Sequence, residues 1–169
     1  MNIIDIIRYE NDLPVEHWDV IEALPKNSGQ GLKFFTDNFK SSSNTNAKTV
    51  FENKKVIVNF LNMTYNQNHV EQAFSSYVSN NFISHTIDGN QNKTQYATQL
   101  KHLISSQSRY DIKRIIAQNE IVLSHAKVTI NAKEYVVMEI FKIQNGKIVE
   151  HYKAQQEIPK NYVHGNGIF

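Results

Sequence analysis

The chain has 169 residues, of which 40% are hydrophobic, a size and composition that suit one domain with its own core. The 18 basic and 16 acidic residues nearly balance, so the composition gives no sign of a nucleic-acid-binding surface. The lack of cysteine excludes a disulfide scaffold, a zinc ribbon, an iron–sulfur centre and a thiol nucleophile. No apolar run is long enough to span a bilayer, and the N-terminus does not have the pattern of a signal peptide, so we expect a cytoplasmic protein that does not enter a membrane.

A segment rich in Ser, Asn and Thr divides the chain: residues 36–47 predict a linker between a short segment, 1–35, and a main body, 48–169. In the main body, apolar residues spaced by three and four predict helices over 48–65, 69–79 and 93–107. Alternating patterns predict strands over 82–87, 110–118, 120–130, 133–144 and 147–156. This order predicts an α+β domain with helices on one face of a curved antiparallel sheet.

The N-terminal segment repeats the end of the chain at an offset of 134 positions. Ten of the 30 positions in residues 6–35 are identical to their counterparts in residues 140–169, including the run Val15, Glu16 and His17. Residues 1–35 are therefore expected to be a partial duplicate of the C-terminal strand and tail. Because the segment is rich in apolar side chains, we expect it to dock as an extra strand, either on its own domain or across a dimer.

The main body resembles the SnoaL-like (polyketide-cyclase-like) branch of the nuclear-transport-factor-two-like superfamily. The resemblance rests on the stretch EIFKIQNGKIVEHY at 139–152 and on the closing GNGIF, with further matches at 53–67, 82–85 and 113–128. It implies a cone-shaped barrel in which three helices are wrapped by a strongly bent, mixed or antiparallel sheet. It also implies a homodimer, a small and largely apolar ligand in the cone pocket, and acid–base chemistry without a metal or organic cofactor.

The resemblance points to candidate catalytic residues on the last two strands, namely Glu139, His151 and Lys153. Strand alternation puts positions 151 and 153 on one face, which the family directs into the cone. Where the polyketide cyclases carry an Asp, this chain has Lys153, which puts cyclase chemistry in question. Lys153 either acts as a base or Schiff-base nucleophile of lowered pKa, or lies at the pocket rim or pairs with Glu139. The N-terminal copy retains the missing acid as Asp19 beside His17, and that pair either completes a pocket or is exposed to solvent.

Further side chains are candidates for lining the pocket. They are His85, His125, Phe60, Tyr65, Phe82, Tyr96 and Phe141. No short metal-ligand motif accompanies the histidines, so we expect no metal. Two functions stay open: a cofactor-independent lyase, isomerase or cyclase, and a non-catalytic ligand-binding or dimerisation module with a vestigial active site.

Overall fold

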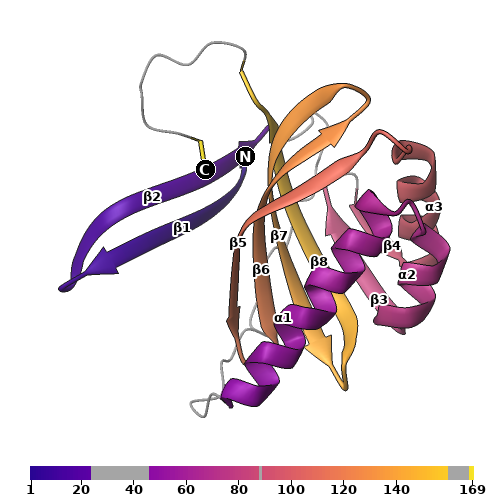
Figure 1. Ribbon diagram of the computed structural model, residues 1–169, viewed down its shortest axis with the longest axis horizontal. Helices are drawn as coiled ribbons and strands as arrows, with labels where there is room; N and C mark the ends of the chain where they lie inside the picture. Colours follow the sequence, from indigo (N-terminus) through magenta and orange to yellow (C-terminus); the bar gives the residue numbers. More distant parts are fainter. Residues whose placement is uncertain (24–45, 88, 160–167) are drawn as a thin grey trace.

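The computed structural model describes residues 1–23, 46–87, 89–159 and 168–169 (Figure 1). Most of the predicted linker and most of the GNGIF-ending tail lie outside these ranges. Within them, no helix is long and apolar enough to cross a membrane.

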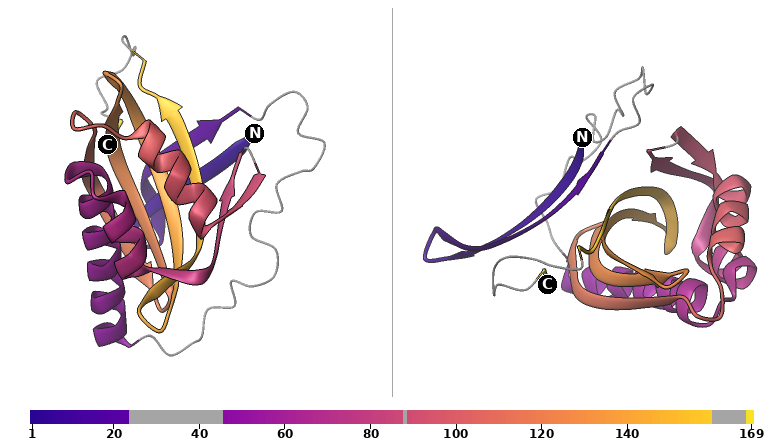
Figure 2. Two further views of the ribbon diagram at one scale, coloured as in Figure 1. Left: turned by 90° about the vertical axis from the view of Figure 1, so that its right-hand side faces the viewer. Right: turned by 90° about the horizontal axis from the view of Figure 1, so that it is seen from above.

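Three helices lie on the concave side of a large sheet (Figures 1 and 2). They are α1 (Ala47–Leu61), which continues into the π-helical turn η1 (Asn62–Asn66), then α2 (Val70–Tyr77) and α3 (Lys93–Leu103). The side chain of Asn46 caps α1 by accepting hydrogen bonds from the backbone amides of Lys48 and Thr49. Asn92 and Gln95 form a reciprocal capping box at the start of α3. The helix predicted over 93–107 ends earlier, because Ile104 already has an extended backbone.

The large sheet has six strands in the order β4-β3-β8-β7-β6-β5. Their bounds are β3 (Val78–Thr86), β4 (Gly89–Asn92), β5 (Arg109–Gln118), β6 (Ile121–Ile130), β7 (Lys133–Gln144) and β8 (Lys147–Glu157). Strands β3 and β8 pair in parallel, and the other neighbours pair antiparallel. The predicted α+β fold with a bent mixed sheet is therefore confirmed, with the short strand β4 added at one edge.

Residues of positive φ make the tight turns between the long strands. Asn145 and Gly146 (φ 51° and 71°) connect β7 to β8, and Asn131 and Ala132 connect β6 to β7 in the same left-handed conformation. Two-residue turns of this kind match the twist of paired strands and fix their register. The register in turn decides which side chains of β7 and β8 point into the cone.

The main core fills the space between the helices and the concave face of the sheet. Aromatic rings meet edge to face or tilted there, as for Phe60 and Phe74, whose centroids are 5.4 Å apart. All five aromatic residues predicted to line the pocket are buried in this core, with at most 5% of their surface exposed. The interior of the cone is thus largely occupied by the protein's own side chains.

The N-terminal segment forms two strands, β1 (Asn2–Glu10) and β2 (Leu13–Glu22), where the sequence predicts one. They pair antiparallel around Asn11 and Asp12, which have φ values of 48° and 62° and so use the same left-handed conformation as Asn145 and Gly146. At the offset of the sequence repeat, β1 corresponds to the second part of β7, and β2 corresponds to β8.

This hairpin packs on the convex face of the six-stranded sheet, opposite the helices (Figures 1 and 2). Ile4, Ile6 and Val20 are buried against β7 and β8, where they cover an apolar strip. The strip consists of Val136, Met138, Ile140, Tyr152 and Ala154. The end of the hairpin that carries its turn projects beyond the sheet.

Candidate functional site

The concave face of the sheet carries a fully buried acid–base pair. Glu139 on β7 and His151 on β8 are each about 1% exposed, and Nε2 of His151 lies 3.3 Å from Oε1 of Glu139. The Nε2 atom is within ion-pair distance of this carboxylate but does not have hydrogen-bond geometry toward it. The two residues belong to neighbouring strands, in which Phe141 pairs with His151 and Glu139 with Lys153.

Hydroxyl groups from three other strands complete the network around the pair. The Tyr110 hydroxyl donates to Oε2 of Glu139 at 2.6 Å and also contacts the Ser124 hydroxyl at 2.8 Å. On the other side, the Ser84 hydroxyl lies 2.9 Å from Nδ1 of His151. If Ser84 donates this bond, the imidazole carries its proton on Nε2, which is the nitrogen that faces Glu139.

The surroundings favour an ionised carboxylate beside a neutral imidazole. Burial acts to raise the pKa of Glu139, but the neighbouring His151, Lys153 and Tyr110 outweigh it, and the pKa is lowered. Burial also lowers the pKa of His151, although the Glu139 carboxylate opposes this shift. The pKa values of the buried tyrosines Tyr65, Tyr96 and Tyr110 are raised, mainly by burial, so their hydroxyls stay protonated.

A small pocket opens at the end of the cone near this network. Its volume is about 80 Å³, room for a few water molecules or a small organic group. The lining residues are Glu22, Thr86, Ile87, Tyr96, Gln99, Leu100, Leu103, Lys153 and Gln155. Lys153 therefore lies at the pocket rim, and Glu22 brings the end of the N-terminal hairpin to the same rim.

Tyr96 lies next to both this pocket and the acid–base pair. It lines the pocket, and its ring centroid is 5.1 Å from that of His151. Phe141 stacks on His151 from another direction, with the centroids 4.9 Å apart. Of the aromatic residues predicted to line the pocket, Tyr96 does so, whereas Phe60, Tyr65, Phe82 and Phe141 are core residues outside it.

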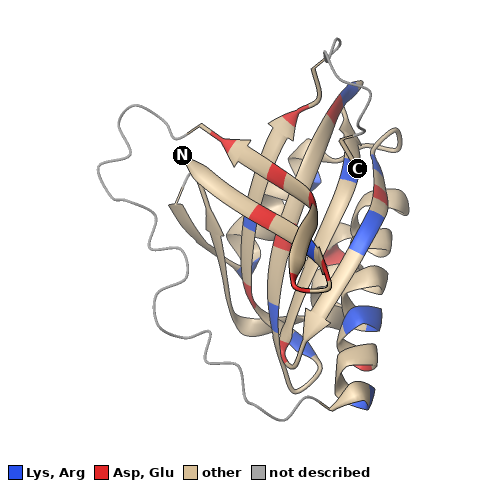
Figure 3. Ribbon diagram, turned by 90° about the vertical axis from the view of Figure 1, so that its left-hand side faces the viewer, with Lys and Arg blue, Asp and Glu red and all other residues tan. Residues whose placement is uncertain are grey.

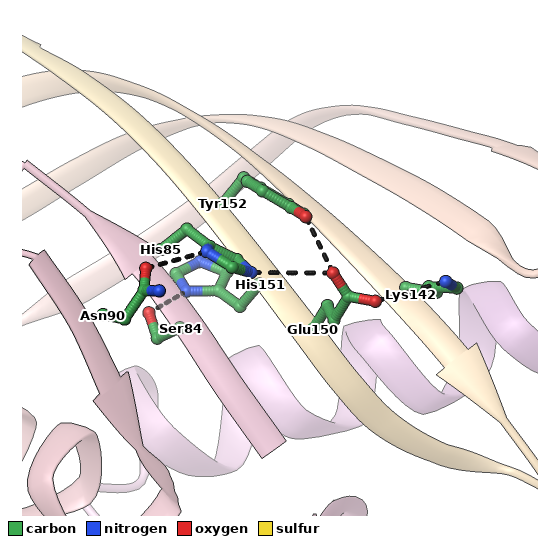
Figure 4. A network of polar contacts seen from close by, with 7 residues as sticks. All are labelled: Ser84, His85, Asn90, Lys142, Glu150, His151 and Tyr152. Atoms are coloured by element: carbon green, nitrogen blue, oxygen red, sulfur yellow. Dashed lines mark hydrogen bonds and ion pairs between the residues drawn. The ribbon is translucent and has the colours of Figure 1, made fainter. Parts of the chain in front are cut away.

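His85 lies on the opposite, convex face of the sheet, because alternation turns it away from its neighbour Ser84 (Figure 4). Its ring stacks on Tyr152 at 4.4 Å, Nδ1 contacts Asn90 at 2.9 Å, and Nε2 lies 3.5 Å from Glu150. Partial burial acts to raise the pKa of Glu150, but hydrogen bonds from Tyr152 and Lys142 outweigh it and lower the pKa. His85 therefore does not line the interior pocket.

His125 also faces outward, on the convex side of the sheet, where it is paired with Met138 of β7. Its side chain is fully buried, Nδ1 lies 3.3 Å from the Arg114 guanidinium, and its ring is 5.3 Å from that of Phe169. Arg114 in turn stacks over Trp18 of the hairpin, 3.6 Å from the ring centroid. The sequence analysis predicted that His125 lines the same pocket as Glu139. This prediction is wrong, because the register of β6 places His125 on the other side of the sheet.

The second acid–base pair suggested by the sequence does not enter the interior. His17 and Asp19 lie on the hairpin face turned away from the sheet, where His17 contacts Asp5 at 3.0 Å. Between them Trp18 points toward the sheet, as alternation requires.

Three residues of the buried network have no motif in the sequence: Ser84, Tyr110 and Ser124. Each is an ordinary polar position in a predicted strand. Pairing Ser124 with Glu139 and Ser84 with His151 across the sheet reveals their role, but this requires the strand order and register. Among the described residues, no group of three or more acidic or histidine side chains is arranged to hold a metal ion.

No protein-family model and no curated protein sequence matches the chain. Solved structures are similar to it in fold. A candidate SnoaL-like polyketide cyclase from Jannaschia sp. CCS1 superposes with a TM-score of 0.58 at 8% identity, over 66% of this chain and 90% of that one. A candidate ketosteroid isomerase from Kribbella flavida gives a TM-score of 0.58 at 11% identity, over 72% and 88% of the two chains.

An epoxide hydrolase from M. tuberculosis has a TM-score of 0.52 and 18% identity, over 63% of this chain and 84% of that chain. These similarities confirm the fold expected from the resemblance: the chain has the nuclear-transport-factor-two-like cone, and its structural neighbours include SnoaL-like proteins. At such low sequence identities the similarity shows a shared fold and does not assign the activities of these proteins to this chain.

Proposed function

We propose that this protein binds a small, largely apolar carbonyl compound at the mouth of the cone and moves a proton on it without a cofactor. The observation that carries the proposal is the buried pair of Glu139 and His151, held by Tyr110 and Ser84. The pair lies next to Tyr96 and Lys153, which both line the described pocket. An ionised carboxylate in an apolar, water-poor site is a suitable general base. The activities named for the structural neighbours include isomerisation and cyclisation, which fit this class of chemistry.

The proposed step is proton abstraction next to a carbonyl group. One oxygen of Glu139 takes the proton from the carbon, and the C–H electron pair moves through the new carbon–carbon double bond to the carbonyl oxygen. The Lys153 ammonium is placed to stabilise the negative charge of this enolate from the rim. His151 and Tyr110 act as positioning residues that hold the carboxylate, and the carboxyl group then returns a proton to the ligand.

Deuterium exchange tests this step without knowledge of the natural substrate. We would incubate the protein in D₂O with acetone, an enolisable ketone small enough for the pocket, and follow the loss of its α-proton signal by NMR. The wild type is expected to accelerate the exchange over buffer, and Glu139→Gln to lose roughly a hundredfold or more of that acceleration. Lys153→Met should lose less, because it removes charge stabilisation but not the base.

Glu150→Gln is the matched control, since it makes the same chemical change on the convex face of the same sheet. It is expected to exchange the α-protons of acetone as fast as the wild type. Equal rates for the wild type and Glu139→Gln would overturn the proposal, as would a rate lost equally in both Gln variants.

One observation favours the alternative of a binding module without catalysis. The interior is filled by packed aromatic side chains, and the pocket beyond them has only about 80 Å³. A protein that binds acetone, seen as shifts of backbone amide signals around Tyr96, but that does not accelerate its exchange would support this second function.

We further propose that residues 1–35 are a partial duplicate of the C-terminal hairpin and tail, joined through the linker to a domain at 48–169. The support is the shared offset: β1 and β2 align with β7 and β8 in the sequence repeat, and both pairs turn through two left-handed residues.

A further inference from the structure

Tyr110, whose hydroxyl donates to Glu139 in the candidate site, lies at the start of an edge strand. Among the described strands β5 pairs with β6 alone, because it is the last in the order of the sheet. Charged residues recur along β5 (Figure 3), and Arg109 and Asp111 on either side of Tyr110 are exposed, whereas Tyr110 itself is packed in the core. The ends of edge strands open easily, so the 2.6 Å hydrogen bond to Glu139 depends on how firmly the backbone of Tyr110 is held.

The side chain of Asn66 binds the backbone of Tyr110 on the outer side of β5. Its Oδ1 accepts a hydrogen bond from the Tyr110 amide at 2.8 Å, and its Nδ2 donates to the Tyr110 carbonyl at 3.2 Å. Paired residues in an antiparallel ladder exchange hydrogen bonds through both backbone groups in the same way. Asn66 therefore does for Tyr110 what a neighbouring strand would do, from a position 44 residues earlier in the chain.

The π-helical turn η1 brings Asn66 to this position, because it is the last residue of that turn. The same turn places Tyr65 against Tyr110, with the ring centroids 4.9 Å apart. It also buries the hydroxyl of Thr64, which has no hydrogen-bond partner among the described residues. A π-helical turn and an unpaired buried hydroxyl both cost stability, and π-helical turns are frequent at functional sites. Both features lie in the segment that contacts Tyr110.

We infer that Asn66 is a positioning residue of the candidate site, an inference that rests on the function proposed above. Its two hydrogen bonds fix the backbone from which the Tyr110 side chain extends, and packing against Tyr65 fixes the direction of the ring. The hydroxyl then stays aimed at Oε2 of Glu139, the general base. Loss of the Asn66 side chain should weaken this hold while the core stays intact, because Asn66 is itself exposed.

A double-mutant cycle with Tyr110→Phe tests whether Asn66 acts through the Tyr110 hydroxyl. In the full chain, Asn66→Ala is expected to slow the protein-catalysed exchange of the acetone α-protons roughly tenfold, because the carboxylate is less well positioned. In Tyr110→Phe the hydroxyl is already absent, so the addition of Asn66→Ala should slow the exchange no further. The control Asn59→Ala makes the same chemical change at an exposed position of α1 and should exchange acetone like the wild type.

A second measurement needs no substrate and therefore separates this inference from the proposed function. The ¹³C chemical shift of Tyr110 Cζ reports the hydrogen bond of its hydroxyl, and the loss of the signal in Tyr110→Phe assigns it. Asn66→Ala should move this signal and Asn59→Ala should leave it in place, with circular dichroism verifying that both variants are folded. Should Asn66→Ala not fold, Asn66→Asp replaces it, since it keeps the acceptor for the Tyr110 amide and loses the donor to the Tyr110 carbonyl.

Two outcomes would overturn the inference. One is a Tyr110 signal that Asn66→Ala leaves unchanged, and the other is an exchange rate that Asn66→Ala lowers by the same factor with and without Tyr110→Phe. The second outcome would mean that Asn66 supports the fold in general and does not act through Tyr110. A wild type that does not accelerate the exchange, but whose Tyr110 signal moves in Asn66→Ala, would count against the proposed function and support the positioning of Tyr110 by Asn66.

Discussion

His125 is fully buried, and its surroundings disfavour the charged form of its imidazole. Its Nδ1 faces the permanently charged guanidinium of Arg114, and its Nε2 has no hydrogen-bond partner among the described residues. Burial, with Arg114 as a further cause, lowers the pKa of His125 from an ordinary value near 6.5 to about 4. The imidazole of His125 is therefore neutral in the folded chain near pH 7.

This burial predicts a loss of stability on mild acidification. Between pH 6.5 and 4 the unfolded chain binds a proton at His125 and the folded chain does not, so the free energy of unfolding falls as the pH falls. The shift corresponds to roughly 3 kcal/mol lost by pH 4. Urea denaturation across this pH range should show the loss in the wild type and a clearly smaller one in His125→Leu.

His102→Leu, at an exposed position on α3, should leave the pH profile of the wild type unchanged. A profile for His125→Leu as steep as that of the wild type would mean that other groups, such as the buried His151, govern the acid sensitivity.

At the scale of elements, a few side chains hold the hairpin of β1 and β2 on the six-stranded sheet. Ile4, Ile6 and Val20 supply its buried apolar surface, and Asn2 anchors its open end by donating from Nδ2 to the Lys153 carbonyl at 2.9 Å and to Glu22 at 3.0 Å. Because Glu22 and Lys153 both line the pocket at the mouth of the cone, the hairpin is coupled to the pocket rim.

Two valines on β2 allow a matched test of this docking. Val20 is fully buried on the sheet, whereas Val15 is 43% exposed near the turn. Val20→Ala should lower the free energy of unfolding by about 1–2 kcal/mol and speed amide hydrogen exchange in β1 and β2. Val15→Ala, the same chemical change on the same strand, should do neither. Equal effects from both substitutions would mean that the hairpin is not held by the face that carries Val20.

At the scale of the whole molecule, local sequence patterns predict the helices and strands well. They do not predict on which face of the sheet each side chain lies. Periodicity places the three helices and the long strands, and the Asn-Gly pair at 145–146 fixes the last hairpin. Glu139 and His151 are correctly placed together because they belong to adjacent strands of that hairpin. His85 and His125 lie on strands whose orientation depends on pairing with distant segments, and a shift of one residue turns a side chain to the opposite face.

The sequence repeat likewise predicts that the N-terminal segment docks, but not how. A single added strand would need a free sheet edge, whereas a hairpin satisfies its own backbone hydrogen bonds and can lie flat on an apolar face. Docking as a hairpin depends on the contacts of Ile4, Ile6 and Val20 with the apolar strip on β7 and β8. Such contacts between distant segments are not visible in local sequence patterns.

Removal of the hairpin should therefore change how molecules associate. Deletion of residues 1–45 uncovers Val136, Met138, Ile140 and the other apolar side chains of the strip, so the truncated chain should melt at a lower temperature and self-associate through this face. Association driven by apolar burial should persist in high salt, because screening weakens interactions between charges and not apolar burial. Sedimentation velocity of the truncated chain and of the full chain, at low and high salt, measures this association. A truncated chain that stays monomeric with an unchanged melting temperature would show that the hairpin contributes neither stability nor cover to this face.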